Sequence, residues 1–388
     1  MASTTPLPVS KKLLYIGFAE TTGYGVAAAG LVRVLRSAGA QVTFAELLPG
    51  HAAGGGQLLT TGFDQGGPAD GVIIHTVPEY YPYWQARLAV SQPGVPVWGY
   101  TAWETDQLPT HWPALLNRLA GVFVPSQWNK AVFEASGVTV PIVVVPHPPE
   151  FGGVAASDSA TTELEPLLHG LDNQFLFYSI GVWSERKAPW LLIRAFLDEF
   201  AATEPVALLL KTGSIDWSSY GRRWYRLFRT GFDPTTRSYA RLVPPARRHQ
   251  LPLLTADLPP AAMSRLHQRA DCFVTLARGE GWGMGAYEAA WFGKPVISTG
   301  MGGVLDFLPA DLAYLLAYRL VPVRCAYGQT SYESHQRWAD VDLAQARRAM
   351  RRVVEHQQEA RQKGRHLQAY VRETFQPARI AATCLAVL

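Results

Sequence analysis

Glu280 and Glu288 are separated by seven residues, and most of the residues around them are small. The segment reads GEGWGMGAYEAAW, with glycine at every second position from Gly279 to Gly285. Small residues let a backbone approach a ligand closely, and carboxylates accept hydrogen bonds from sugar hydroxyls. The spacing therefore suits a sugar, a diphosphate and a ribose held in a row between the two carboxylates. A tight turn without a ligand is the structural alternative for the glycines.

A strand, a glycine-rich loop and a helix must position these residues. The apolar run from Cys272 to Leu276 is typical of a buried parallel strand. A helical pattern follows from Met284 to Phe292 and ends at Gly293. This order places Glu280 at the carboxyl end of the strand and Glu288 about one turn into the helix. The first amides of such a helix lack partners and lie at its positive end, so they attract a phosphate.

Two adjacent cations, Arg186 and Lys187, follow the strand that we expect at residues 175–181. Cations beside a diphosphate offset its charge and stabilise it as a leaving group. Ligands of parallel α/β units bind outside the carboxyl ends of the strands, so this loop should face the same site as Glu280. Lys211, at the end of the next expected strand, is a further candidate. A solvated basic loop is the alternative.

The segment around Glu280 and Glu288 resembles the E-x7-E motif of retaining glycosyltransferases of family 4, which have the two-domain GT-B fold. The resemblance implies that Glu280 contacts the donor hexose and that Glu288 binds the nucleotide ribose. It assigns the contacts with hexose and diphosphate to the backbone of Gly283, Met284, Gly285 and Ala286. Gly285 departs from the family, which often has proline there, and we expect a looser loop that keeps its amides.

The basic loop also resembles the family. Its members usually carry an arginine soon after the glycine that ends the strand and a lysine further on. Val182 stands at the first of these places, and Lys187 matches the lysine. We take Arg186 as the substitute for the missing arginine.

A second part of the chain extends the resemblance into the N-terminal half, through the motifs WETD and VPSQWN. Many family members carry a histidine of the cleft where this sequence has Thr101 and Ala102. The residue that replaces it on the acceptor side is left open between Thr101, Glu104 and Asp106. We favour Glu104 as the catalytic candidate.

The first strand is expected at Leu13 to Phe18, and a helix follows it, with Gly23 and Gly25 in the loop between them. A dinucleotide fingerprint would read G-x-G-x-x-G, but Gly30 comes two places late and no acid follows at a convincing offset. The family resemblance implies instead that this loop, and Gly25 in particular, touches the donor phosphate or the acceptor. A turn that only permits close packing is the alternative.

Apolar runs alternate with helical patterns through both halves of the chain, which predicts parallel sheets covered on both faces. His75 ends one of these runs, and we expect it to be an interior residue with its hydrogen bonds satisfied. Ser126 is expected to cap the helix that follows it. The further strands are expected at residues 41–48, 71–76, 95–100, 121–124, 142–145, 206–211 and 251–255.

The predicted fold is α/β, of the GT-B type, with two Rossmann-like domains that face a central cleft. Four prolines between residues 141 and 149 mark the domain boundary. We expect an acceptor-side domain at residues 1–148 and a donor domain for the nucleotide sugar at residues 149–365. By resemblance, residues 366–388 form a helix that returns to the N-terminal domain.

Composition agrees with this organisation, because 388 residues suit two domains of about 150 to 200 residues. A net charge of +4, from 35 basic and 31 acidic residues, does not indicate nucleic-acid binding. Three scattered cysteines argue against a disulfide framework or a thiolate metal site, and favour a reducing, cytoplasmic setting. With no signal-like N-terminus and no run of about 18 apolar residues, we expect no transmembrane segment.

Two charged segments have simple structural interpretations. Residues 216–250 contain eight arginines and two aspartates, with aromatic residues among them. We favour an exposed helix, and peripheral contact with an anionic membrane surface is the alternative. The sequence DVD at residues 340–342 could suggest a metal site. It precedes a helical pattern, so we interpret its aspartates as cap and first-turn charges and expect no metal.

Together these features predict a retaining, metal-independent glycosyltransferase that moves a hexose from a nucleoside diphosphate sugar to a hydroxyl acceptor, on a glycan, a lipid-linked molecule, a protein or a small molecule. No acidic residue is placed as a covalent nucleophile, so we expect the front-face, diphosphate-assisted route usually proposed for the family. The donor is a substrate, and no tightly bound cofactor is expected. The alternatives are a GT-B epimerase or hydrolase, which needs no acceptor, and a non-catalytic protein that binds a sugar nucleotide or a glycan. The base, sugar, acceptor and oligomeric state are not encoded legibly in these residues.

Overall fold

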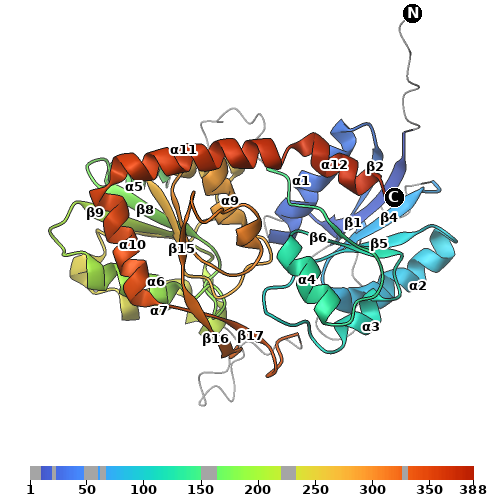
Figure 1. The fold of residues 1–388 in the computed structure, drawn as a ribbon, viewed down its shortest axis with the longest axis horizontal. Helices are drawn as coiled ribbons and strands as arrows, with labels where there is room; N and C mark the ends of the chain where they lie inside the picture. Colours follow the sequence, from blue (N-terminus) through green and yellow to red (C-terminus); the bar gives the residue numbers. More distant parts are fainter. Residues whose placement is uncertain are drawn as a thin grey trace, which may run out of the picture. The chain divides into compact units, whose positions relative to one another are not determined.

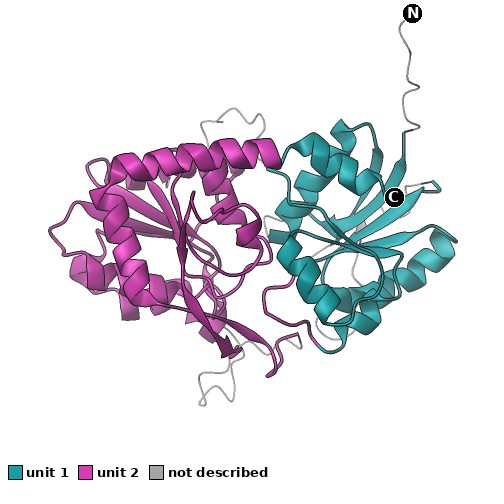
Figure 2. Ribbon diagram, in the orientation of Figure 1, with its two compact units in different colours: residues 1–102, 110–150, 375–388 teal, residues 103–109, 151–374 magenta. Residues whose placement is uncertain are grey.

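The computed structural model describes residues 10–19, 23–47, 60–61, 67–149, 164–219, 233–325 and 331–388. The chain divides into two compact units (Figure 2). Unit 1 comprises residues 1–102, 110–150 and 375–388, and unit 2 comprises residues 103–109 and 151–374. Each unit contains a mainly parallel sheet with helices, so the predicted α/β class is confirmed. The domain limits at residues 148 and 365 stay a proposal about independent folding.

Unit 1 is built on a seven-stranded sheet in the order β3-β2-β1-β4-β5-β6-β7. Every pair is parallel except β2 with β3. The central strands are buried on both faces, which explains their continuous apolar runs. The bounds are β1 Lys12–Phe18, β2 Gln41–Leu47, β3 Thr60–Thr61, β4 Gly71–His75, β5 Val97–Tyr100, β6 Gly121–Val124 and β7 Ile142–Val144.

The helices of unit 1 include one from the far end of the chain, α12, which packs on α1 (Figure 1). Ser126 caps α4 as predicted, because its side chain accepts a hydrogen bond from the backbone N–H of Asn129 at 3.1 Å. The bounds are α1 Gly23–Ser37, the 3₁₀ helix η2 Pro78–Tyr80, α2 Tyr81–Ser91, α3 Trp112–Leu116, α4 Gln127–Ala135 and α12 Pro377–Leu385.

Unit 2 is built on a six-stranded sheet in the order β12-β9-β8-β13-β14-β15, and all of its pairs are parallel. Two antiparallel pairs, β10 with β11 and β16 with β17, stand apart from this sheet. The bounds are β8 Phe175–Ile180, β9 Val206–Lys211, β10 Ile215–Asp216, β11 Asp233–Pro234, β12 Leu253–Leu254, β13 Cys272–Thr275, β14 Val296–Thr299, β15 Tyr314–Leu316, β16 Tyr318–Pro322 and β17 Arg337–Val341.

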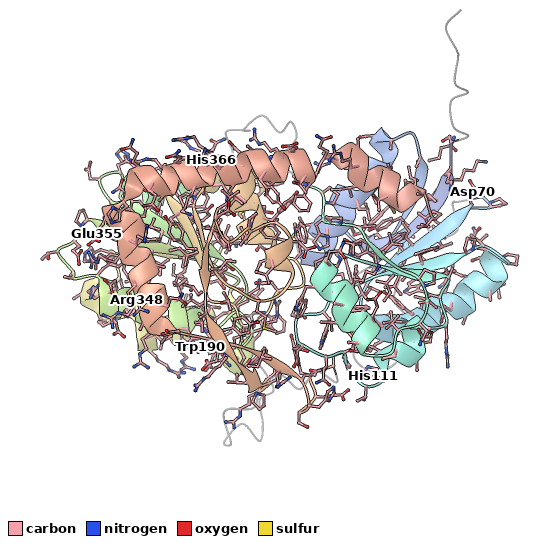
Figure 3. All side chains as sticks on the ribbon, in the orientation of Figure 1. Asp70, His111, Trp190, Arg348, Glu355 and His366 are labelled. Atoms are coloured by element: carbon pink, nitrogen blue, oxygen red, sulfur yellow. The ribbon has the colours of Figure 1, made fainter. Side chains whose placement is uncertain are left out.

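The helices of unit 2 cover this sheet with one apolar face each. On α10, Ala346, Met350 and Val353 join the core, whereas Arg348 and Glu355 are exposed (Figure 3). The bounds are α5 Leu164–His169, α6 Pro189–Glu199, α7 Thr235–Leu242, α8 Pro260–Arg269, α9 Met284–Trp291, α10 Leu343–Glu355 and α11 Gln357–Thr374, with 3₁₀ helices η4 Trp217–Ser219, η5 Pro245–Arg247 and η6 Gly303–Asp306.

Several local expectations require correction. Gly25 lies within the first turn of α1 rather than in the loop before it, because the helix already begins at Gly23. The DVD segment is split: Asp342 caps α10 as expected, whereas Asp340 lies on β17 and pairs with Arg319 at 2.9 Å. The antiparallel partner strand β16 was not expected from the sequence.

The arginine-rich segment is described only in part, because residues 220–232 lie outside the described residues. Its C-terminal part contains the short helix α7, so a single helix through residues 216–250 is wrong. Within the described part of the chain, no helix combines the length and apolar character needed to cross a bilayer.

Candidate functional site

The glycine-rich loop between β13 and α9 packs so tightly that most side chains are excluded from it. A Cβ on Gly279 would come within 1.9 Å of the carbonyl oxygen of Glu104, and one on Gly283 would come within 2.6 Å of Val304. Gly283 also has a φ of +93°, which favours glycine. On the other side, the N–H of Gly303 donates to the carbonyl oxygen of Glu280 at 2.8 Å. The loop therefore has a fixed backbone that orients the Glu280 side chain.

The Glu280 carboxylate, in a residue that is 9% exposed, binds both candidate cations. Lys187 donates to its Oε1, and Arg186 donates to its Oε2 at 3.1 Å and to the carbonyl oxygen of Gly279 at 2.8 Å. Residues almost a hundred positions apart are thus brought together as the sequence predicted they should be. The three side chains form one compact charged cluster at the carboxyl ends of β8 and β13.

The loop from β8 to α6 holds Arg186 and Lys187 in place. The backbone N–H of Arg278 donates to the carbonyl oxygen of Arg186 at 2.7 Å, which ties this loop to the end of β13. Ala188, immediately after Lys187, has a φ of +43° and precedes α6. A left-handed alanine is costly by about 1 kcal/mol or more, so the surrounding contacts over-determine this conformation.

Glu104 joins the same cluster, because residues 103–109 belong to unit 2. Its Oε1 lies 3.4 Å from Nη2 of Arg186. Asp106 fastens the segment by accepting hydrogen bonds from the backbone N–H and the side chain of Arg337, at 2.7 and 2.8 Å. Of the three acceptor-side candidates, Glu104 therefore lies with the cations, and Asp106 anchors its own segment.

Thr101, the third of those candidates, lies in unit 1. It is buried, and its hydroxyl lies 3.1 Å from the hydroxyl of Tyr24. His75, also buried in unit 1, makes a hydrogen bond through Nδ1 with the hydroxyl of Tyr15 at 2.5 Å, as expected of a satisfied interior residue. Gly25 belongs to unit 1 as well, in the first turn of α1.

The two carboxylates on Arg186 have pKa values that move in opposite directions. Burial alone would raise the pKa of Glu280, but Lys187 and Arg186 outweigh it, so this pKa lies below its ordinary value. Burial raises the pKa of Glu104 above its ordinary value, because Arg186 offsets only part of the desolvation and Glu280 repels the charge. Burial lowers the pKa of Lys187, and Glu280 restores only part of it.

Glu288 lies about one turn into α9, as predicted, and faces α8. Its Oε2 lies 3.2 Å from Nε2 of His267, and Nδ1 of His267 lies 2.7 Å from the hydroxyl of Tyr178. Sequence reasoning missed His267 and Tyr178. A lone histidine in a helical pattern gives no sign of its partner, because the contact depends on how α8 packs against α9.

The backbone candidates Gly283, Met284, Gly285 and Ala286 occupy the N-cap and first turn of α9. The first N–H groups of a helix have no partner within it, so this turn has the polarity that a diphosphate requires. A Cβ on Gly285 would lie 3.1 Å from Phe273 and 3.3 Å from Ile180, so the helix start packs directly on β8 and β13. This close packing does not indicate the looser loop that we expected at Gly285.

Lys187 and Lys211 line the same small cavity, of about 30 Å³, at the ends of β8, β9 and β13. Nζ of Lys211 donates to the carbonyl oxygen of Thr212 at 3.2 Å, and the hydroxyl of Thr212 is buried without a hydrogen-bond partner. Burial lowers the pKa of Lys211. The structure therefore brings Lys211 into the neighbourhood of the cluster, on the far side of Lys187 from Glu280.

A metal site is not apparent in the described residues, where no three His, Cys, Asp or Glu side chains come together as ligands would. The charged cluster alternates cations and carboxylates instead. Such an arrangement can bind an anion and hydroxyl groups side by side.

One family matches part of the chain by sequence. Residues 251–384 match the model of a family described as "Family 4 Glycosyltransferase in conflict systems". This range includes β13, the glycine-rich loop and α9, and so both glutamates of the motif. No curated protein matches the chain.

Solved structures resemble nearly the whole chain in fold. HepE of Anabaena, described in complex with UDP and glucose, is 15% identical, covers 97% of this chain and 100% of its own, and has a TM-score of 0.65. Sucrose-phosphate synthase of Thermosynechococcus elongatus is 16% identical, with coverage of 97% and 98% and a TM-score of 0.65. TarM of S. aureus is 12% identical, with coverage of 81% and 54% and a TM-score of 0.56.

At these identities the solved structures establish the fold, which is GT-B, as predicted. The family match adds sequence similarity over the part of the chain that contains the Glu280 to Glu288 motif. Together they confirm the resemblance to family 4 that the sequence motifs indicated.

Proposed function

We propose that this GT-B glycosyltransferase of family 4 is a retaining enzyme that transfers a hexose from a nucleoside diphosphate sugar to a hydroxyl acceptor. The observation that carries the proposal is the cluster of Glu280 with Lys187 and Arg186, placed beside the start of α9. The HepE structures are described with UDP, with UDP and glucose, and with UDP-glucose, so UDP-glucose is the first donor to test.

Each site residue has a role in this proposal. Lys187 and Arg186 bind the diphosphate and stabilise it as it departs, together with the first amides of α9. Glu280 accepts hydrogen bonds from hydroxyls of the hexose, and Glu288 accepts them from the ribose. Lys211 adds positive charge behind Lys187, and Gly25 contributes backbone from unit 1.

Two features of the reaction follow from these roles. Glu280 is held by two cations and Glu104 has a raised pKa, so neither is arranged as a free carboxylate nucleophile. We therefore propose front-face transfer with retention, in which the departing diphosphate assists the acceptor hydroxyl. The cations that neutralise the diphosphate are side chains, so we propose that no metal is required. Addition of EDTA should leave the rate unchanged.

The first prediction concerns Lys187. The wild-type chain should bind UDP more tightly than UMP, and Lys187→Ala should reduce the affinity for UDP by roughly tenfold, the scale of a charge-assisted hydrogen bond, with a smaller effect on UMP. Isothermal titration calorimetry measures both constants. Lys130→Ala, at a partly exposed lysine of α4, is the matched control and should change neither.

The result for the wild type decides the proposal. If UDP, GDP and ADP all fail to bind, the donor site does not exist as described. If a nucleotide sugar binds and is consumed equally fast with and without hydroxyl acceptors, the protein is a hydrolase or epimerase. The anomeric configuration of the product, followed by NMR, then distinguishes retention from inversion.

A further inference from the structure

Tyr178, His267 and Glu288 form a chain of hydrogen bonds from the middle of the unit 2 sheet to α9. Tyr178 lies on β8, His267 on α8 and Glu288 on α9. The Tyr178 hydroxyl lies 2.7 Å from Nδ1 of His267, and Nε2 of the same ring lies 3.2 Å from Oε2 of Glu288. Three separate elements thus converge on one carboxylate oxygen.

The imidazole of His267 is fixed by its packing. Both His267 and Tyr178 are 0% exposed. The His267 ring stacks on Phe292, with ring centroids 5.0 Å apart and an angle of 3° between the planes, and meets the edge of Tyr178 at 5.4 Å. A side chain confined in this way holds its hydrogen-bond partner in one orientation.

The direction of the hydrogen bonds follows from the chemistry of the groups. Burial raises the pKa of Tyr178 well above its ordinary value, so its hydroxyl keeps its proton. The hydroxyl then donates to Nδ1, which makes Nε2 the protonated nitrogen of a neutral ring. Nε2–H donates to Glu288, whose side chain is 12% exposed and so keeps an accessible edge.

We infer that Tyr178 and His267 are positioning residues, which orient the Glu288 carboxylate toward the ribose hydroxyls of the donor. The inference rests on the proposed function. A carboxylate fixed before the nucleotide arrives loses little side-chain entropy on binding, so it gains affinity for a ribose over a deoxyribose. A buried tyrosine–histidine pair that only satisfied the core would not change this selectivity.

The test compares UDP with 2′-deoxy-UDP in the full chain, by isothermal titration calorimetry. The wild type should bind UDP roughly tenfold or more tightly than the deoxy compound, as expected of a hydrogen bond to a charged group. His267→Leu should reduce this ratio to near one, mainly by weakening UDP. His267→Gln keeps an N–H donor close to the position of Nε2 and should restore part of the ratio.

Other variants keep the test decisive if His267→Leu does not fold. Tyr178→Phe removes only the hydroxyl and should lower the ratio by a smaller factor. Glu288→Gln should remove it, and adding Tyr178→Phe to Glu288→Gln should then change nothing further. His75→Leu is the matched control, because it breaks a buried tyrosine–histidine pair of unit 1 and should leave the ratio unchanged.

Three results would overturn or limit the inference. It is wrong if folded His267→Leu and Tyr178→Phe retain the wild-type ratio, or if they weaken both nucleotides equally. It is also wrong if Glu288→Gln retains the ratio. If the wild type binds no nucleotide at all, the proposed function itself fails, and that result is distinct from a wild type that binds without dependence on His267.

Discussion

Arg186 contacts two carboxylates, Glu104 and Glu280, that respond differently to pH. The pKa of Glu280 is lowered in the folded chain, so its stabilising contribution is present above the ordinary value of 4.5 and is lost as the pH falls through the lower folded value. The pKa of Glu104 is raised. Its contribution is greatest below 4.5 and is lost as the pH rises through the higher folded value.

A matched pair of substitutions tests these opposite signs. Between about pH 3 and pH 7, Glu280→Gln should become steadily more destabilising relative to the wild type, because the carboxylate that it lacks becomes favourable. Over the same range Glu104→Gln should change in the stabilising direction. Urea unfolding at a series of pH values measures both differences. Parallel curves for the two variants would contradict the assignment of charges in the cluster.

At the scale of elements, the glycine-rich loop is held by contacts that leave no space for a Cβ. The loop between β13 and α9 approaches residues 103–109 at Gly279, and the turn before η6 approaches it at Gly302. Gly302 has a φ of +95°, and its Cβ would lie 2.4 Å from the carbonyl oxygen of Glu280. The position of Glu280 therefore depends on backbone packing from two other segments.

Gly279→Ala should destabilise the chain by about 3 kcal/mol, the upper part of the usual range for overpacking, because the obstructing atom is backbone. Thermal and chemical denaturation measure this loss. Gly213→Ala is the control, since nothing lies within 4 Å of its Cβ position, and it should change the free energy of unfolding by less than about 1 kcal/mol. Equal stability of the two variants would show that segment 103–109 does not pack on the loop.

The sequence predicted the elements that carry the motif because each has a local signal. The apolar run became β13, and the helical pattern that stops at Gly293 became α9. The strand pair β16 and β17 was missed, because β16 is largely exposed and has no apolar run. A continuous helix through residues 344–371 was suggested by composition, but α10 ends at Glu355 and α11 begins at Gln357.

The charged cluster was predicted in part, for a physical reason. Parallel strands present their carboxyl ends at one edge of a sheet, so Lys187, Arg186 and Glu280 could be placed together from strand order alone. The contact of Glu104 with Arg186 and of His267 with Glu288 depends on long-range packing, which leaves no trace in local spacing. The roles of these residues stay predictions until binding is measured.

At the scale of the whole molecule, the chain passes between its two units four times, at residues 102/103, 109/110, 150/151 and 374/375. The last passage brings α12 into unit 1. There Ile380, Ala381 and Cys384 are buried, and a Cβ on Gly71 would lie 3.3 Å from Leu388. Nζ of Lys11 donates to the carbonyl oxygen of Leu385 at 3.1 Å. Unit 1 is therefore completed by the far end of the chain.

Ile380→Asp should destabilise unit 1 by several kcal/mol, because it places an unpaired carboxylate in an apolar interior. Hydrogen exchange should quicken in β1 and β4 and change little in β8 and β9. Val387→Asp, at a position 39% exposed, is the control and should leave exchange unaltered. Faster exchange confined to β8 and β9 would contradict the assignment of α12 to unit 1.

The return of the chain to unit 1 also has a consequence for synthesis on the ribosome. Residues 1–150 emerge first, but the helix that completes their unit is translated last. At roughly 5–20 residues per second, the interval between them is on the order of tens of seconds. During this interval the face of α1 that α12 will cover is exposed to solvent and to other nascent chains. A trigger factor or similar holdase would thus be needed by the first unit for longer than by the second, although the first is made earlier.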